Sequence, residues 1–165
     1  MQTPSITIAV TQEVANATLD ESRLRDAVSR ALERQAVSHA SIGVAIVDDE
    51  VIHRLNHQYL QHDYPTDVLS FPLSAAGEPL EGEIVVSVDT AAAEARRYGW
   101  STDDELLLYV IHGALHLLGY DDQNTAAAAE MRQAESEVLA HFGLTPHNET
   151  GPADAAPAKQ LEEAG

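Results

Sequence analysis

The fold of this chain is decided by residues 106–118, which read LLLYVIHGALHLL. This stretch is apolar nearly all the way round at helical spacing, so the helix it forms should be buried at the centre of a domain. Gly119 follows directly and can end the helix in a left-handed conformation. The preceding Thr102-Asp-Asp-Glu105 has the pattern of a capping box. We therefore expect a central helix that begins near Thr102 and ends at Gly119.

The segments around this helix predict four strands and four further helices. Alternating Ile6, Ile8 and Val10 indicate a half-buried strand over residues 5–10. The continuous run IGVAIV at 42–47 is typical of a strand that is covered on both faces. Two more strands are expected over 67–73 and 83–88, and the other helices are expected after a capping box at Thr18-x-x-Glu21, over about 50–61, over 89–98 and after Asn124.

The order of these elements predicts a single α+β domain with a four-stranded mixed sheet and about five helices. A length of 165 residues suits one domain, and a hydrophobic content of 44% supplies its core. We expect this domain to cover residues 1–144. Residues 145–165 hold Pro, Ala, Glu and Gly without periodicity, so we expect them to form a disordered tail.

Composition excludes several classes of protein and of site. The absence of cysteine excludes disulfide scaffolds, Cys-ligated zinc, iron–sulfur clusters and thiol nucleophiles. The N-terminal sequence lacks the features of a signal peptide and no apolar run is long enough to cross a bilayer, so we expect a cytoplasmic protein without a membrane partner. With 27 acidic against 9 basic residues, the net charge of −18 argues against tight, sequence-independent binding of RNA or DNA.

Two histidines on the central helix form the strongest candidate site. His112 and His116 are four residues apart, so they lie on one face of the helix and can offer two imidazoles to one metal ion. Gly119 then turns the chain back, and Asp122 follows six residues after His116. Three protein ligands with an open fourth position are typical of a catalytic zinc site. The sequence therefore predicts a metal site on the central buried helix.

Other interpretations of this pattern stay open. His112 and His116 could be core histidines that are bonded to backbone carbonyls. A zinc peptidase helix carries H-E-x-x-H, whereas Gly113 occupies the position of that general base, so a peptidase is not expected. Two histidines and an aspartate also form the facial triad of non-haem iron oxygenases. A second pair, His53 and His57, has polar neighbours and no carboxylate turn after it, so we interpret it as a solvated helix face.

Three segments of the chain carry a family pattern: HGALHLLGYD at 112–121, NHQY at 56–59 and PTDVLSFP at 65–72. With these motifs the chain resembles the YbeY family of bacterial metal-dependent endoribonucleases, in collinear order from about residue 5 to 143. The resemblance implies an α+β fold, zinc as the metal, single-stranded RNA as the substrate, and a role in ribosomal RNA maturation and ribosome quality control. It also implies that His112 and His116 are the first two metal ligands.

The chain departs from the family pattern at two positions. Asp122 occupies the place of the family's third histidine, and an aspartate oxygen is also a zinc ligand, at about 2.0–2.2 Å. Leu60 stands after the NHQY segment where the family usually carries an arginine, whose fork would suit phosphate oxygens. The resemblance further implies that Thr66, Asp67 and Ser70 line the cleft that binds the substrate.

These observations predict a zinc-dependent endoribonuclease in which His112, His116 and Asp122 hold one divalent ion per chain. Its expected partners are ribosomal RNA or the small ribosomal subunit, and DNA is not expected. Two alternatives remain at this point. One is a ribosome-assembly factor with weak or no nuclease activity, which Leu60 and the acidic composition favour. The other is a metal-dependent hydrolase of a small molecule.

Overall fold

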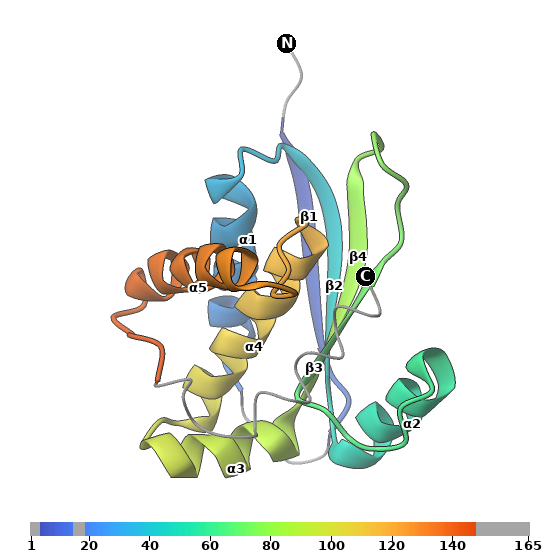
Figure 1. Ribbon diagram of the computed structural model, residues 1–165, viewed down its shortest axis with the longest axis vertical. Coiled ribbons are helices and arrows are strands. Elements are labelled where there is room, and N and C mark those ends of the chain that lie inside the picture. The colour runs from blue at the N-terminus through green and yellow to red at the C-terminus, as the bar shows by residue number, and fades with distance from the viewer. Residues whose placement is uncertain (1–3, 15–18, 148–165) are drawn as a thin grey trace.

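The computed structural model describes residues 4–14 and 19–147. The described residues form one α+β domain with a four-stranded mixed sheet and five helices, as the sequence predicts (Figure 1). In chain order the elements are β1 (Ser5–Gln12), α1 (Glu21–Arg34), β2 (His39–Val47), α2 (Asp49–Leu60), β3 (Val68–Pro72), β4 (Leu80–Ser87), α3 (Val88–Tyr98), α4 (Thr102–Leu117) and α5 (Thr125–Ala140).

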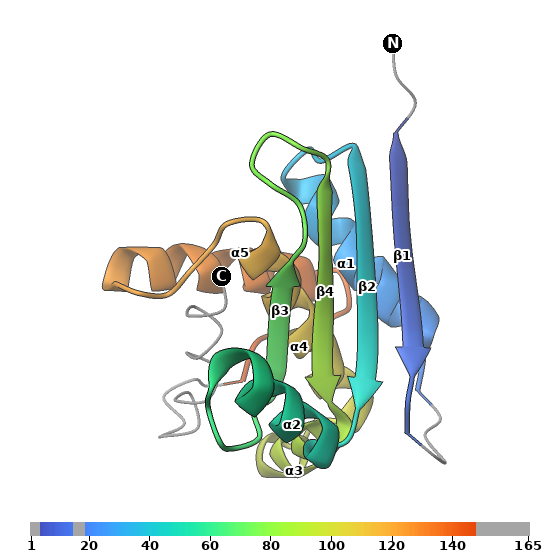
Figure 2. The same cartoon turned by 90° about the vertical axis from the view of Figure 1, so that its right-hand side faces the viewer.

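The sheet has the strand order β1-β2-β4-β3, which Figure 2 shows face on. β1 pairs with β2 and β2 with β4 in parallel, whereas β3 pairs with β4 antiparallel and forms one edge. Side chains alternate between the two faces of β2: Ile42, Val44 and Ile46 are buried, whereas Ser41 is exposed. Within the predicted strand 42–47, the second-face residues Gly43 and Ala45 are half-buried, so that face is only partly covered, with α2 over one end of the sheet (Figure 2).

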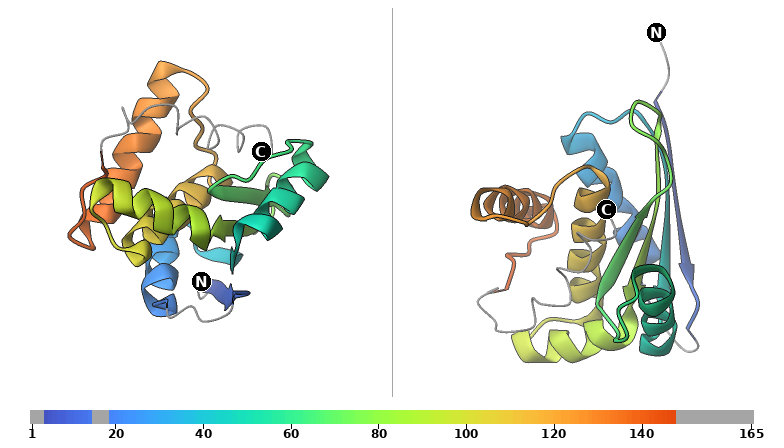
Figure 3. Two further views of the ribbon diagram at one scale, coloured as in Figure 1. Left: turned by 90° about the horizontal axis from the view of Figure 1, so that it is seen from below. Right: turned by 45° about the vertical axis from the view of Figure 1, so that its right-hand side comes forward.

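α4 is the buried central helix that the sequence predicts. It lies between the sheet on one side and α5 on the other, with α1 beside it (Figures 1 and 3). Gly113 allows this close packing, because a Cβ atom at that position would lie 2.7 Å from Cγ2 of Ile84 on β4 and 3.2 Å from Oγ of Ser70 on β3. The apolar side of α4 is thus pressed against β3 and β4. None of the described helices is both long and apolar enough to cross a membrane.

The helix caps differ from the expected capping boxes. α4 is capped by Ser101, whose hydroxyl accepts a hydrogen bond from the Asp104 backbone amide, and not by Thr102. α1 is capped by Asp20, which accepts from the Arg23 amide, and Thr18 lies outside the described residues. Asn124 caps α5 as expected, by accepting from the Ala127 amide. Both corrected caps lie close to the expected positions, so the elements themselves are unaffected.

The chain keeps packing contacts beyond residue 144. The ring of His147 stacks on Tyr98 with centroids 3.8 Å apart and meets the edge of Trp100. Its Nε2 lies 3.2 Å from each carboxylate oxygen of Glu105, which is 1% exposed. The Glu105 carboxylate therefore contacts His147 instead of capping the N-terminus of α4. The expected tail from 145 to 165 otherwise falls on residues 148–165, which lie outside the described residues.

Candidate metal centre

The two histidines of α4 face each other across one helical turn. The Nε2 atoms of His112 and His116 are 3.1 Å apart, and their rings meet at an interplanar angle of 74°. Two nitrogen ligands at 2.0–2.1 Å from a tetrahedral zinc ion are about 3.3 Å apart. The pair is therefore set close to the spacing that one zinc ion requires of two ligands.

Each ring also contacts a group outside the pair. Nδ1 of His112 contacts Oε2 of Glu135, a residue of α5, and both side chains are largely buried, at 17% and 13% exposure. The His116 ring hydrogen-bonds the Tyr120 backbone, and this bond raises the His116 pKa. A bond that raises a histidine pKa is one that the ring donates, so its acceptor is the Tyr120 carbonyl. Both imidazoles are thus oriented by acceptors outside the pair.

The two histidines differ in their affinity for a proton. Burial works to lower the pKa of His112, but Glu135, followed by Asp67 and Asp122, outweighs it and raises that pKa above its ordinary value. Burial and the positive charge of His112 lower the pKa of His116 to about 3. In the metal-free protein His116 is therefore neutral at physiological pH, and its ring nitrogen is available as a ligand.

The negative charge of Asp122 acts on the histidine pair. It follows the turn that Gly119 makes at φ 102°, its Oδ1 is buried, and its negative charge contributes to the raised His112 pKa. Among the described residues, however, no three His, Asp or Glu side chains are gathered closely enough to surround an ion. The two imidazoles fit a zinc ion by their spacing, and Asp122 carries a carboxylate, a donor type that zinc accepts.

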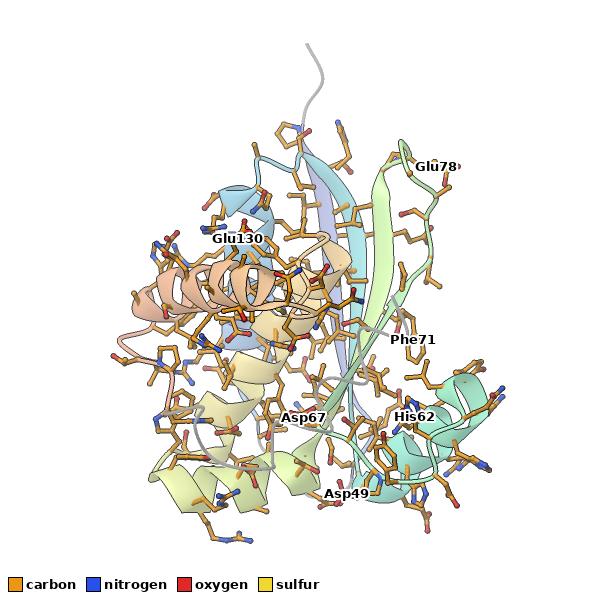
Figure 4. The ribbon with its side chains drawn as sticks, viewed as in Figure 1. Asp49, His62, Asp67, Phe71, Glu78 and Glu130 are labelled. Atoms are coloured by element: carbon orange, nitrogen blue, oxygen red, sulfur yellow. The ribbon has the colours of Figure 1, made fainter. Side chains whose placement is uncertain are left out.

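The PTDVLSFP segment forms the edge strand β3 and the turn before it. Asp67 is half-buried, and its Oδ1 accepts from the Val68 amide at 2.8 Å and from Thr66 Oγ1 at 3.3 Å. Burial raises the Asp67 pKa, and the nearby charge of His112 works against that rise. Ser70 is buried and donates to the Gly113 carbonyl at 3.0 Å. The segment therefore reaches α4 at two points, through the Asp67 charge and the Ser70 bond, and Figure 4 shows Asp67 near the lower end of β3.

Glu135 contacts the site but is not among the residues that the sequence predicts for it. The inward face of α5 carries Met131, Ala134 and Val138, all of them buried. Glu135 follows Met131 by four residues, so a carboxylate interrupts this apolar face. A charged residue on a buried helix face needs a partner, so the position of Glu135 in the sequence could have indicated a contact with a polar group of another element.

The second histidine pair lies on α2, in water. His57 is exposed, and the His53 side chain, 41% exposed, contacts Asp63 with its Nε2 2.8 Å from Oδ1. The hydrogen bond from His53 lowers the pKa of Asp63. This arrangement is that of a solvated helix face, as the sequence predicts.

Leu60 ends the same helix. It is half-buried and packs against the hydrophobic core, while its neighbour Tyr59 is 59% exposed and meets the Phe71 ring edge-on, with centroids 5.7 Å apart. Phe71 lies between β3 and α2 in Figure 4. A longer polar side chain at position 60 could therefore leave the core for the surface near this aromatic pair.

Comparison with known proteins gives a consistent family. A family model described as endoribonuclease YbeY matches residues 8–143. Proteins named endoribonuclease YbeY are 42% identical over 125 residues in Rhodopirellula baltica, 39% over 129 residues in Salinibacter ruber and 43% over 135 residues in Sulfurovum sp.. These matches cover 74%, 73% and 76% of this chain and 64%, 82% and 90% of the respective relatives.

A solved structure agrees with the sequence matches. The solution structure of TM1509 from Thermotoga maritima has a TM-score of 0.57 and 29% sequence identity, and the match covers 89% of this chain and 99% of that one. The family match spans most of the chain and includes β2 to β4, α4 and α5. The chain therefore belongs to the endoribonuclease YbeY family.

Proposed function

We propose that this chain is a zinc-dependent endoribonuclease that cuts single-stranded RNA in ribosomal RNA maturation and ribosome quality control. The endoribonuclease role follows from membership in the family. The identity of the metal, the preference for single-stranded RNA and the role in ribosomal RNA maturation are what we propose. The observation that carries the proposal is the pair of Nε2 atoms, 3.1 Å apart, on the buried helix.

In this proposal His112 and His116 hold the ion through Nε2, and Asp122 holds it through a carboxylate oxygen. Zinc, when bound, supplies positive charge that polarises a phosphodiester and makes water more acidic. The chain's own residues position and shield the site: Glu135 and the Tyr120 carbonyl orient the two rings, and Ser70 ties β3 to the metal helix. Thr66 and Asp67 lie where β3 begins and are proposed to face the substrate.

The charge of the chain bears on its partners. A net charge of −18 leaves few cations to neutralise phosphates, so free RNA should bind weakly. We propose that the small ribosomal subunit presents the RNA to the enzyme in the cytoplasm. The acidic surface would then meet basic ribosomal proteins instead of the RNA backbone.

The decisive experiment measures cleavage of a single-stranded RNA and of the same sequence in a duplex. We expect cleavage of the single strand alone, its loss in chelator and its return with zinc. His116→Ala should be inactive, and His57→Ala, the matched control on the solvated helix, should cleave like wild type. Cleavage that survives both the chelator and His116→Ala would contradict the metal-dependent mechanism. Absence of cleavage together with co-sedimentation with the small subunit would favour the assembly-factor alternative.

A further inference from the structure

We propose that Glu135 is a positioning residue for the metal centre, which keeps the proton of the His112 ring on Nδ1 and so aims the Nε2 lone pair at the ion. The inference rests on the proposed function, because it assigns a role toward the same metal. It concerns a residue on a different helix from the two histidines, α5 in place of α4.

The geometry of the contact supports this role. Oε2 of Glu135 contacts Nδ1 of His112, and only 17% of the His112 side chain and 13% of the Glu135 side chain are exposed. α5 crosses the side of α4 that faces away from the sheet (Figure 3), so the carboxylate comes from a separate helix that packs on α4. The other ring nitrogen, Nε2, lies 3.1 Å from Nε2 of His116. Glu135 therefore holds the His112 ring at Nδ1, and Nε2 points toward His116.

The chemistry of the two groups fixes the tautomer. An ionised carboxylate accepts hydrogen bonds and cannot donate one, so Nδ1 of His112 must carry the hydrogen. In a neutral imidazole Nε2 then has the free lone pair that a metal needs. Carboxylates that receive the second N–H of a metal-binding histidine also raise its strength as a ligand, and their loss commonly weakens metal binding about 10–100-fold.

A purely structural role is the competing explanation, in which Glu135 holds α5 onto α4. α5 has other means of attachment, because Met131, Ala134 and Val138 are each at most 2% exposed. The contact between α4 and α5 therefore does not depend on the carboxylate. A structural role would lower stability and leave the metal affinity and the His112 tautomer unchanged.

The test compares Glu135→Ala and Glu135→Gln with Glu130→Gln, an exposed glutamate of the same helix that is labelled in Figure 4. Zinc affinity is measured by competition with a chelating dye. The His112 tautomer is read in metal-free protein from the ¹⁵N shifts of the ring, at a pH above the His112 pKa, where the ring is neutral. We expect Glu135→Ala to bind zinc about 10–100-fold more weakly and to lose the fixed Nδ1–H tautomer. Glu135→Gln should fall between, because its amide oxygen still accepts from Nδ1, and Glu130→Gln should match wild type.

The outcomes separate this inference from the proposed function. Zinc affinity of Glu135→Ala within twofold of wild type, with an unchanged His112 tautomer, would overturn the role of Glu135 alone. Failure of wild type to bind zinc would overturn the proposed metal site, and the tautomer measurement would still decide whether Glu135 orients His112. If Glu135→Ala does not fold, Glu135→Leu replaces it with the same expectation, because leucine extends the apolar face of α5.

Discussion

His112 and His116 on α4 and His53 and His57 on α2 have the same four-residue spacing, and their surroundings differ in every other respect. The α4 pair is half-buried, its Nε2 atoms face each other, and one ring contacts a carboxylate from another helix. In the α2 pair His57 is exposed and His53 contacts Asp63, whose side chain is 78% exposed. Spacing alone therefore does not distinguish the two pairs, whereas burial and the carboxylate contact do.

The difference lies in burial and in the charges that converge. Burial lowers the pKa of His116 to about 3 and so leaves a neutral ligand, while Glu135 and two aspartates supply negative charge around its partner. On α2, solvent screens the interaction between His53 and its one exposed aspartate. The buried pair with nearby carboxylates is therefore the better candidate for a cation site.

Removing one histidine from each pair should have the largest effect. We expect wild type to hold about one zinc ion per chain, His116→Ala to lose it, and His57→Ala to keep it, because two remaining ligands rarely retain zinc. Elemental analysis after gel filtration measures the zinc content. Equal zinc in His116→Ala and wild type would show that the α4 pair is no more a metal site than the α2 pair.

A substitution at position 60 tests whether α2 can contribute to catalysis through a residue other than its histidines. In Leu60→Arg a guanidinium could form two charge-assisted hydrogen bonds with a substrate phosphate. A well-placed donor of this kind is commonly worth about a hundredfold in rate. We expect this variant to cleave single-stranded RNA up to about a hundredfold faster than wild type, in a zinc-dependent manner, as measured by initial rates.

Tyr59→Arg is the matched control for Leu60→Arg, because it places the same charge at the exposed neighbouring position. It should show little of the gain. Leu60→Arg with an unchanged melting temperature and the wild-type rate would refute the idea that the family arginine is a phosphate ligand missing here.

The buried pair should also leave a signature in the pH dependence of stability. His116 has a pKa of about 3 in the folded chain against 6.5 when unfolded, so unfolding takes up a proton between these values. In chelator the free energy of unfolding therefore falls as the pH drops below about 6.5, by up to about 1.4 kcal/mol per pH unit from this residue. The raised pKa of His112 has the opposite effect on the free energy of unfolding, because it adds stability at low pH that is lost as the pH rises.

Urea denaturation of wild type and His116→Gln between about pH 4 and 7 measures this contribution. The variant should lose stability less steeply toward low pH. His57→Gln should follow wild type throughout. Parallel profiles for wild type and His116→Gln would mean that His116 is not held neutral in the fold.

The smallest expected effect concerns the third ligand. Asp122→His should retain zinc and hydrolyse RNA up to several times faster, because a neutral imidazole donates less charge than a carboxylate and leaves water at the ion more acidic. Zinc content and initial rates over a range of pH measure it. Zinc content and rates that are unchanged both in this variant and in Asp122→Ala would show that the turn after Gly119 does not bring residue 122 to the ion.

The sequence predicted the fold well because its strongest signals were local. The all-round apolar stretch at 106–118 could only be a buried helix, and turn residues such as Gly99 and Gly119 do adopt positive φ. The coverage of β2 was harder, because β-branched residues suit a strand whether or not its second face is packed. The caps were displaced because Asp20 and Ser101 compete with neighbouring threonines for the same role.

The candidate site was predictable only as far as it is contained in one helix. His112 and His116 share a face by helical geometry, which the sequence specifies. Glu135 reaches His112 because of how α5 crosses α4, and a crossing angle depends on packing that a single sequence does not display. His147 reaches the buried Glu105 for a similar reason, from a segment without periodicity.

The contact between His112 and Glu135 closes a loop of 23 residues within the last third of the described chain. Closing so short a loop costs little chain entropy, whereas the parallel pairing of β1 with β2 must join segments across a whole crossover helix. All the proposed ligands lie inside that loop. We therefore expect the α4–α5 hairpin to acquire its metal-binding geometry early in folding, and opening of β1 at the far edge of the sheet to leave the bound zinc in place.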